Sequence, residues 1–341
     1  MLCLLTVICL SSCKGFESVG PEEFAALIAD GKAQLIDVRR SDEFAEEHIP
    51  GALNLNSESW TFMEEAEVTL DPALPVALYC RSGRRSAETA EKLAKKGYKI
   101  VDLKGGVLAW GAAGLPLVDS RGSEVDLFIT PSGKPVVFHA LVHASMLIQY
   151  DGLNIYVDPV TKMGGRVFNY IGMPRPQYVF VTHEHGDHFD REALSSMTAA
   201  EIVTNARCAE MLGRGTVMAN GDTRDLGDII KVEAVPAYNK TEGRTHLHPK
   251  GRDNGFILTI DGLRIYVAGD TEDVDEMADI HDIDVAFMPC NQPYTMTPEQ
   301  LVNAVKIVKP KVVFPYHYGN TDLSGIPADI DGTEVRIRQY Q

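Results

Sequence analysis

The sequence of 341 residues predicts an α/β domain, with a parallel sheet flanked by helices, followed by a domain in which two sheets pack together. Three observations lead to this prediction. Short apolar runs alternate with helical patterns up to residue 118, a polar segment follows at residues 119–124, and two hairpin patterns come after it. The length agrees with two domains, each large enough to bury a core.

The first domain is predicted from strand and helix patterns that alternate. Apolar runs typical of buried strands, separated by stretches with helical spacing, cover residues 34–38, 75–79 and 99–103. Strands separated by helices favour a parallel sheet, because parallel neighbours need a crossover connection. We therefore expect residues 14–119 to form one α/β domain.

The second domain is predicted from a hairpin pattern that occurs twice. Apolar runs flank Asp151-Gly152 and again Asp261-Gly262, and Asp-Gly between such runs is a strong signal for a tight turn. Two similar hairpins suggest a sandwich of two sheets built from related halves. We expect residues 120–341 to form this domain.

Composition excludes some classes of function. The chain carries 48 Asp and Glu against 32 Lys and Arg, which gives a net charge of −16. Because phosphate contacts need a basic surface, we expect no nucleic-acid partner.

The N-terminal segment resembles a lipoprotein signal peptide. Residues 1–10 are uncharged and mostly apolar, and Leu10, Ser11 and Ser12 precede Cys13, as in a bacterial lipobox. This resemblance implies that residues 1–13 contain the signal and that Cys13 is acylated, so that a lipid anchor would hold the protein at the membrane of the cell envelope. The alternative is a misassigned start and a cytoplasmic protein.

A cysteine loop follows the second apolar run of the first domain. Cys80 lies where a predicted strand ends and a helix begins, so unpaired backbone N–H groups and the helix dipole favour its thiolate. Arg81, Arg84 and Arg85 add positive charge, and Gly83 allows the loop to turn tightly. We predict that Cys80 is a nucleophile in an anion-binding cradle.

The first domain resembles a single rhodanese domain. Four motifs occur in the order typical of that family, at residues 35–39, 48–52, 80–85 and 105–110. The resemblance implies sulfur transfer, in which Cys80 takes sulfur from a donor, holds it as a persulfide and passes it to an acceptor. Asp37 and Arg39 are expected to form a structural ion pair. The alternative is a binding module without transfer activity.

A metal site is predicted in the second domain. His183, His185, Asp187 and His188 occur within six residues at the end of an apolar run. Alternation along a strand places His183 and His185 on the same side, where both can bind one ion, and Asp187 and His188 can bind a second.

Two further ligands are predicted at the ends of other strands. Asp270 and His317 each follow an apolar run, and a carboxylate such as Asp270 is suited to bridge two ions. We expect two divalent metal ions, with zinc favoured by the nitrogen and oxygen ligands and manganese or iron as alternatives.

This part of the chain resembles the metallo-β-lactamase superfamily, and most closely the branch that contains ascorbate-6-phosphate lactonase and N-acyl-phosphatidylethanolamine phospholipase D. The supporting motifs are those of the predicted metal site together with residues 143–145, 158–159 and 269–271. The resemblance implies an αββα fold and a hydrolase in which Asp187 orients a metal-activated nucleophile. A small-molecule lactone, phosphodiester or related ester is the expected substrate.

One position departs from the superfamily pattern. Asn239 stands where a third histidine ligand is expected, and His248 lies a few residues later. Asn239, His248 and His143 are possible ligands of a metal or of the substrate, and we expect His143 to lie near the metals. The alternative function is an iron dioxygenase that oxidises a persulfide delivered by Cys80.

Overall fold

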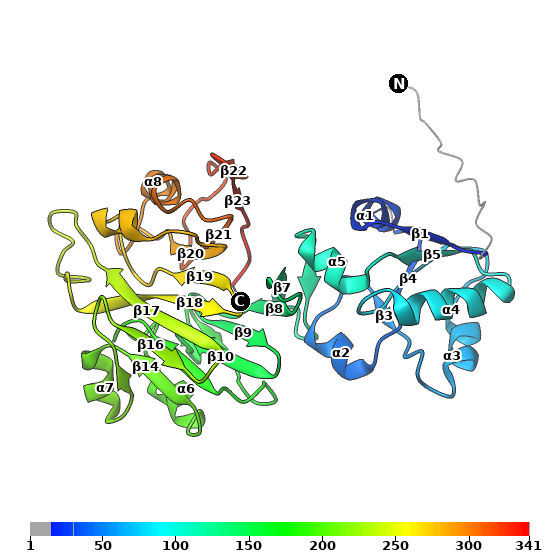
Figure 1. Ribbon diagram of the computed structural model, residues 1–341, viewed down its shortest axis with the longest axis horizontal. Helices are drawn as coiled ribbons and strands as arrows, with labels where there is room; N and C mark the ends of the chain where they lie inside the picture. Colours follow the sequence, from blue (N-terminus) through cyan, green and yellow to red (C-terminus); the bar gives the residue numbers. More distant parts are fainter. Residues whose placement is uncertain (1–14, 30, 341) are drawn as a thin grey trace. The chain divides into compact units, whose positions relative to one another are not determined.

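The computed structural model describes residues 15–29 and 31–340, and the chain divides into two compact units after Phe128 (Figure 1). The predicted signal segment and Cys13 lie outside the described residues. Residues 120–128, which we expected in the second domain, belong to the first unit. The reason is local, because β7 (Glu124–Ile129) pairs with β6 (Leu117–Val118) as an antiparallel hairpin.

The first unit contains the predicted parallel sheet. Its strands lie in the order β1-β5-β4-β2-β3, and each neighbouring pair is parallel. These strands are β1 (Glu17–Val19), β2 (Gln34–Asp37), β3 (Leu53–Asn54), β4 (Val76–Tyr79) and β5 (Ile100–Leu103). The helices are α1 (Pro21–Ile28), α2 (Ser41–Glu46), α3 (Phe62–Thr69), α4 (Arg84–Lys95) and α5 (Gly106–Ala112).

A buried ion pair ties α2 to this sheet. Arg39 is 1% exposed, and its side chain donates from Nε and Nη2 to Asp37 at 2.8–3.1 Å, and from Nη1 to Glu47 at 2.6 Å. The contacts confirm the structural role predicted for Asp37 and Arg39. Because each buried charge has an opposite partner, removal of one would leave the other uncompensated.

The second unit contains two mixed sheets. The first has the order β15-β14-β13-β10-β9-β8, and the second has the order β16-β17-β18-β19-β20-β21-β23-β22. The first consists of β8 (Pro135–Ala140), β9 (Met146–Tyr150), β10 (Leu153–Val157), β13 (Tyr178–Val181), β14 (Glu201–Thr204) and β15 (Thr216–Val217). The second consists of β16 (Thr223–Leu226), β17 (Ile230–Ala237), β18 (Asp253–Ile260), β19 (Leu263–Val267), β20 (Val285–Pro289), β21 (Val312–Tyr316), β22 (Asp329–Ile330) and β23 (Thr333–Val335).

Both predicted hairpins are present. Strands β9 and β10 pair antiparallel around Asp151-Gly152, and β18 and β19 do so around Asp261-Gly262. Both aspartates have positive φ angles, which matches the turn type that Asp-Gly favours. The apolar run before the first hairpin is divided, however, since residues 141–145 leave the sheet between β8 and β9 and carry His143.

The two sheets pack face to face, and helices cover their outer faces. Phe180 of β13 meets Phe256 of β18 with ring centroids 5.2 Å apart. The outer clusters include Leu194 and Cys208 on one side and Leu301 on the other. These residues come from α6 (Arg191–Ser196), α7 (Ala206–Leu212) and α8 (Pro298–Val308), so the unit has the predicted αββα arrangement (Figure 1).

This arrangement determines where the polar side chains gather. Strands β10, β13, β19 and β21 end at Val157, Val181, Val267 and Tyr316, shortly before Asp158, His183, Asp270 and His317. Strand β13 is parallel to β10, and β20 is parallel to both β19 and β21. The carboxyl ends of these strands therefore lie at one edge of the sandwich. Among the described residues, no helix has the length and apolarity needed to cross a membrane.

Candidate metal centre

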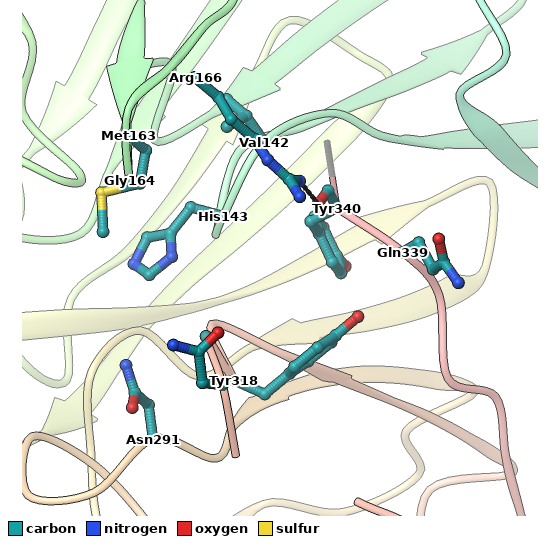
Figure 2. A pocket seen from close by; sticks show the side chains of 11 residues that line it. Val142, His143, Met163, Gly164, Arg166, Asn291, Tyr318, Gln339 and Tyr340 are labelled. Atoms are coloured by element: carbon teal, nitrogen blue, oxygen red, sulfur yellow. Dashed lines mark hydrogen bonds between the residues drawn. The ribbon is translucent and has the colours of Figure 1, made fainter. Parts of the chain in front are cut away.

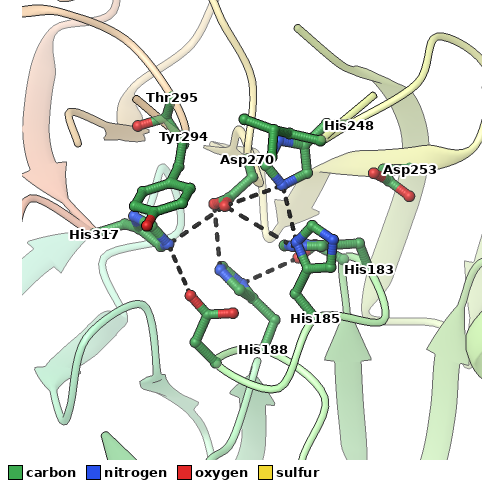
Figure 3. Close-up of polar contacts among 12 residues, drawn as sticks. His183, His185, His188, His248, Asp253, Asp270, Tyr294, Thr295 and His317 are labelled. Carbon is green, nitrogen blue, oxygen red and sulfur yellow. Dashed lines mark hydrogen bonds and ion pairs between the residues drawn. The ribbon is translucent and has the colours of Figure 1, made fainter. Parts of the chain in front are cut away.

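Three histidines form the first group of ligand atoms at this edge. His185 Nδ1 lies 3.1 Å from His183 Nε2 and 3.2 Å from His248 Nε2 (Figure 3). Nitrogens that bind one tetrahedral zinc at about 2.0–2.1 Å are separated by about 3.3–3.4 Å. The spacing therefore fits a single ion, and His248 occupies the place expected for the third histidine.

A second group gathers beside the first. Asp187 Oδ2 lies 3.2 Å from His143 Nε2 and 3.4 Å from His317 Nε2. His188 belongs to the same cluster, in which one ligand atom of each residue lies within 4.8 Å of all the others. The predicted ligands of the second ion are therefore brought together from strands far apart in the sequence.

Asp270 lies between the two groups. Its Oδ2 is 3.3 Å from both His248 Nε2 and His317 Nε2, and its Oδ1 is 3.2 Å from His188 Nε2 (Figure 3). One carboxylate thus faces a histidine of the first group and two of the second. This is the geometry that a bridging ligand requires.

Several ligand atoms have no hydrogen-bond partner among the described residues, although they are buried. These atoms are His188 Nε2, His317 Nε2 and Asp270 Oδ1. Burial of polar atoms without a partner is costly, and buried native groups of this kind usually have an explanation such as a bound ion. The donor set and its unsatisfied atoms fit a pair of divalent cations.

Asn239 orients His248 instead of replacing it as a ligand. The Asn239 Nδ2 group donates to the carbonyl of Tyr294 at 2.8 Å, so its Oδ1 must accept. That oxygen lies 2.6 Å from His248 Nδ1, which therefore carries the proton and leaves a lone pair on Nε2. A metal role for Asn239, which we left open, is not what this geometry favours.

A second network orients His183 and His188. Asp158 accepts the backbone N–H and the hydroxyl of Thr182 at 2.8 and 2.7 Å and lies 2.7 Å from His188 Nδ1. Since the Thr182 hydroxyl donates to Asp158, it accepts from His183 Nδ1 at 3.0 Å. Both histidines then direct Nε2 into the site. The position of Asp158 at the end of an apolar run was the available signal for this role.

Glu272 anchors the loop that carries His248, and sequence reasoning missed it. The side chain is fully buried, and its Oε2 accepts the backbone N–H groups of Lys240 and Thr241 at 2.8 and 2.7 Å. The chain then turns so that Asn239 N also donates to His248 O at 2.9 Å. An acidic residue directly after Asp270 and Thr271 was the only signal in the sequence.

Three site residues have backbone conformations that L-amino acids seldom adopt. His143, Asp158 and His317 have φ angles of 57°, 43° and 50°. Such conformations cost of order 1–3 kcal/mol each and are concentrated at functional sites. They direct these side chains toward the ligand cluster from loops that follow strands.

The pKa shifts differ between the two groups of ligand residues. Burial lowers the pKa values of His183 and His185, so both are neutral ligands near pH 7. Burial also opposes the charged form of His188, but Asp270 and Asp158 outweigh it and raise the pKa of His188. Burial would likewise raise the pKa of Asp187, but its contacts with His143 and His317 lower it.

The structure also places the cysteine loop of the first unit. Cys80 follows β4, and its Sγ accepts the N–H of Gly83 at 3.2 Å. The N-terminus of α5 packs closely on the loop, because Val107 N donates to Cys80 O at 2.8 Å. A Cβ at Gly106 would lie 2.4 Å from Cys80 O, so only glycine fits there.

Two of the three predicted arginines of this loop already pair with carboxylates, so they are less available to an anion. Cys80 and the three arginines line a pocket of about 460 Å³. However, Arg85 donates to both carboxylate oxygens of Glu43 at 2.6 and 2.8 Å, and Arg84 pairs with Glu88 at 3.0 Å. Glu43 comes from α2, and the sequence alone did not indicate this neutralising partner.

Comparison with protein families agrees with both units. Residues 138–317 match the model of a beta-lactamase superfamily domain, and residues 20–113 match a rhodanese-like domain. The chain belongs to the beta-lactamase superfamily. The matched segment contains every histidine and aspartate of the two ligand groups, and the chain combines a rhodanese-like domain with a metallo-β-lactamase fold.

Proteins similar to this chain are named as metal-dependent hydrolases. The chain is 30% identical to a UPF0173 metal-dependent hydrolase of Pyrobaculum neutrophilum over 57% of its own length and 88% of the relative. It is 34% identical to a UPF0173 metal-dependent hydrolase of Symbiobacterium thermophilum, over 48% of its own length and 75% of that relative. A solved structure from Parabacteroides distasonis, named as a candidate metal-dependent hydrolase, is 45% identical with a TM-score of 0.62, over 64% of this chain and all of that chain.

Proposed function

We propose that the second domain is a metal-dependent hydrolase that binds two divalent ions, preferably zinc, and acts on a small-molecule ester. The observation that carries this proposal is the position of Asp270 between two complete groups of ligands. The names of the relatives support the same reaction type.

The chain's own residues prepare the reaction site. When bound, divalent ions at such a site activate water as a nucleophile and stabilise negative charge on the substrate oxygen. The lowered pKa keeps Asp187 ionised, so it accepts the Nε2 proton of His143. His143 thereby orients Asp187, and His143 is a positioning residue in this proposal. Asp187 in turn would orient the attacking water.

The size of the adjoining pocket supports a small-molecule substrate. A pocket of about 560 Å³ includes His143 in its lining, and this volume lies within the usual range for small ligands. We propose a lactone, a phosphodiester or a related ester as substrate, in line with the lactonase and phospholipase branch that the motifs resemble.

Metal analysis and a hydrolysis screen test this function together. We expect two metal ions per chain by elemental analysis and hydrolysis of at least one lactone or phosphodiester. Asp270→Asn should lose the two ions and the activity. Asp273→Asn, three residues away, should keep the ions and the activity. One tightly bound iron with persulfide oxidation would instead support the dioxygenase alternative.

For the first domain we propose sulfur transfer through a persulfide on Cys80. The Gly83 N–H that contacts Sγ, the adjacent helix N-terminus and the open pocket support this role. Formation of thiocyanate from thiosulfate and cyanide should be lost in Cys80→Ser. If the wild-type protein is inactive with several sulfur donors, the domain is a binding module.

We also propose that Cys13 anchors the protein in the cell envelope of a bacterium. The residues from Leu10 to Cys13 support this, since they match the lipobox pattern. The mass of the protein from its native host should correspond to a chain that begins at an acylated Cys13. An unmodified N-terminus that includes residues 1–12 contradicts the proposal.

A further inference from the structure

A pocket beside the ligand cluster contains an arginine that the proposed hydrolysis does not use. The pocket lies within the second unit and is lined by His143, Arg166, Asn291, Tyr318 and Tyr340, among others. Figure 2 shows these side chains around one shared space. His143 also contacts Asp187, so this space adjoins the ligand cluster.

Arg166 has no acidic partner in the part of the chain that the structure describes. It belongs to β12 (Arg166–Val167), which pairs with β11 (Lys162–Met163) in a two-stranded hairpin, and its side chain is exposed. Its Nη1 donates to the backbone carbonyl of Tyr340 at 3.0 Å (Figure 2). An arginine has five N–H donors in a planar fork, so most of them remain available for a ligand.

The surroundings of Arg166 favour recognition of an anion. The chain has a net charge of −16, so an anionic ligand needs a local cation to approach the site. The side-chain amides of Asn291 and Asn320 line the same pocket and form no hydrogen bond with other described residues. A guanidinium fork is suited to bind two oxygens of one carboxylate or phosphate, and the two amides add donors elsewhere in the lining of the same pocket.

We propose that Arg166 binds an anionic group of the substrate, a carboxylate or a phosphate, and thereby presents the ester to the metal centre. This inference rests on the proposed hydrolase function and specifies its substrate class. The ester substrate would carry a negative charge at some distance from the bond that is cleaved.

Binding of simple anions tests this proposal without turnover. Calorimetry would measure the affinity of the metal-loaded protein for glutarate and for phenylphosphonate, which represent the two anion types. Arg166→Ala should weaken binding of at least one anion by about tenfold or more. Arg166→Lys should restore part of the affinity, because it keeps the charge but loses the fork. The anion that responds identifies the substrate group.

A matched variant controls for the loss of a cation from this hairpin. Lys162→Ala removes such a cation, but Lys162 pairs with Glu192 at 3.8 Å and does not line this pocket. This variant should retain the wild-type affinity for the anions.

Turnover of matched esters separates this inference from the hydrolase function. If the function holds, 4-nitrophenyl glutarate and 4-nitrophenyl acetate are both hydrolysed, and Arg166→Ala raises KM for the charged ester only. If Arg166 supports anion binding but neither ester is hydrolysed, the anion site stands and ester hydrolysis fails. Equal anion affinity in the wild type and Arg166→Ala, or no anion binding by either, overturns the proposal.

Discussion

The Nδ1 atom of His248 lies 2.6 Å from the side-chain oxygen of Asn239. This contact fixes the tautomer of His248 and directs its Nε2 toward His185 and Asp270. Asn239, which departs from the superfamily pattern, therefore orients His248, and His248 takes the place of the missing histidine ligand.

The first prediction concerns this contact. Asn239→Leu keeps the branched shape of the side chain but removes the acceptor, so His248 is no longer oriented. The affinity of the first site for metal should fall by about 10–100-fold, as measured by competition with a chelating indicator. His246→Ala is the control, since His246 is exposed and outside both ligand groups. Unchanged metal affinity in Asn239→Leu would show that His248 is oriented by other means.

The second prediction concerns removal of metal. A bound ion stabilises the native state, by about 2.7 kcal/mol for each site when its free concentration is 100 times Kd. Treatment with a chelator should therefore lower the Tm of the wild-type protein, and added zinc should restore it. Asp270→Asn should show the low Tm already and respond little to chelator. A wild-type Tm that does not depend on chelator contradicts metal binding at this cluster.

The third prediction concerns thiol reactivity. Burial raises the pKa values of Cys208 and Cys290 to about 12, so both remain protonated and unreactive at pH 8. Cys80 is also buried, but it lines a pocket and has an N–H donor to its sulfur. Iodoacetamide at pH 8 should modify Cys80 much faster than the other two, as measured by peptide mass analysis. Similar rates at all three positions would count against an activated Cys80.

The fourth prediction concerns the pairing of Arg85 with Glu43. The hydrogen bond from Arg85 outweighs burial and lowers the pKa of Glu43, so its negative charge stands beside Cys80 at neutral pH. Glu43→Gln removes that charge and leaves Glu58, 3.7 Å away, as the remaining carboxylate beside the Arg85 guanidinium, while the amide oxygen can still accept the N–H of Arg40. The KM for thiosulfate should fall several-fold in the thiocyanate assay.

A remote charge provides the control for this variant. Glu67 pairs with Lys96 at 2.7 Å and does not line the cysteine pocket. Glu67→Gln should leave the KM for thiosulfate unchanged. An unchanged or higher KM in Glu43→Gln would mean that Arg85 does not contribute to binding of the sulfur donor.

Much of the fold was predictable because its signals are local. The alternation of apolar runs and helices predicted the parallel sheet, and the two Asp-Gly turns predicted the hairpins around Asp151 and Asp261. The split between β8 and β9 was not predicted, because residues 141–145 are as apolar as the strands that they separate.

The sequence by itself determined which residue types were present for metal chemistry and where short-range spacing placed them, as for His183 and His185. Only the tertiary structure decided that His248 joins them, that Asn239 orients it, and that Glu43 neutralises Arg85. Spacing along a strand follows from backbone geometry within a few residues. Contacts across long stretches of chain depend instead on how loops and helices pack, which is set by the whole fold.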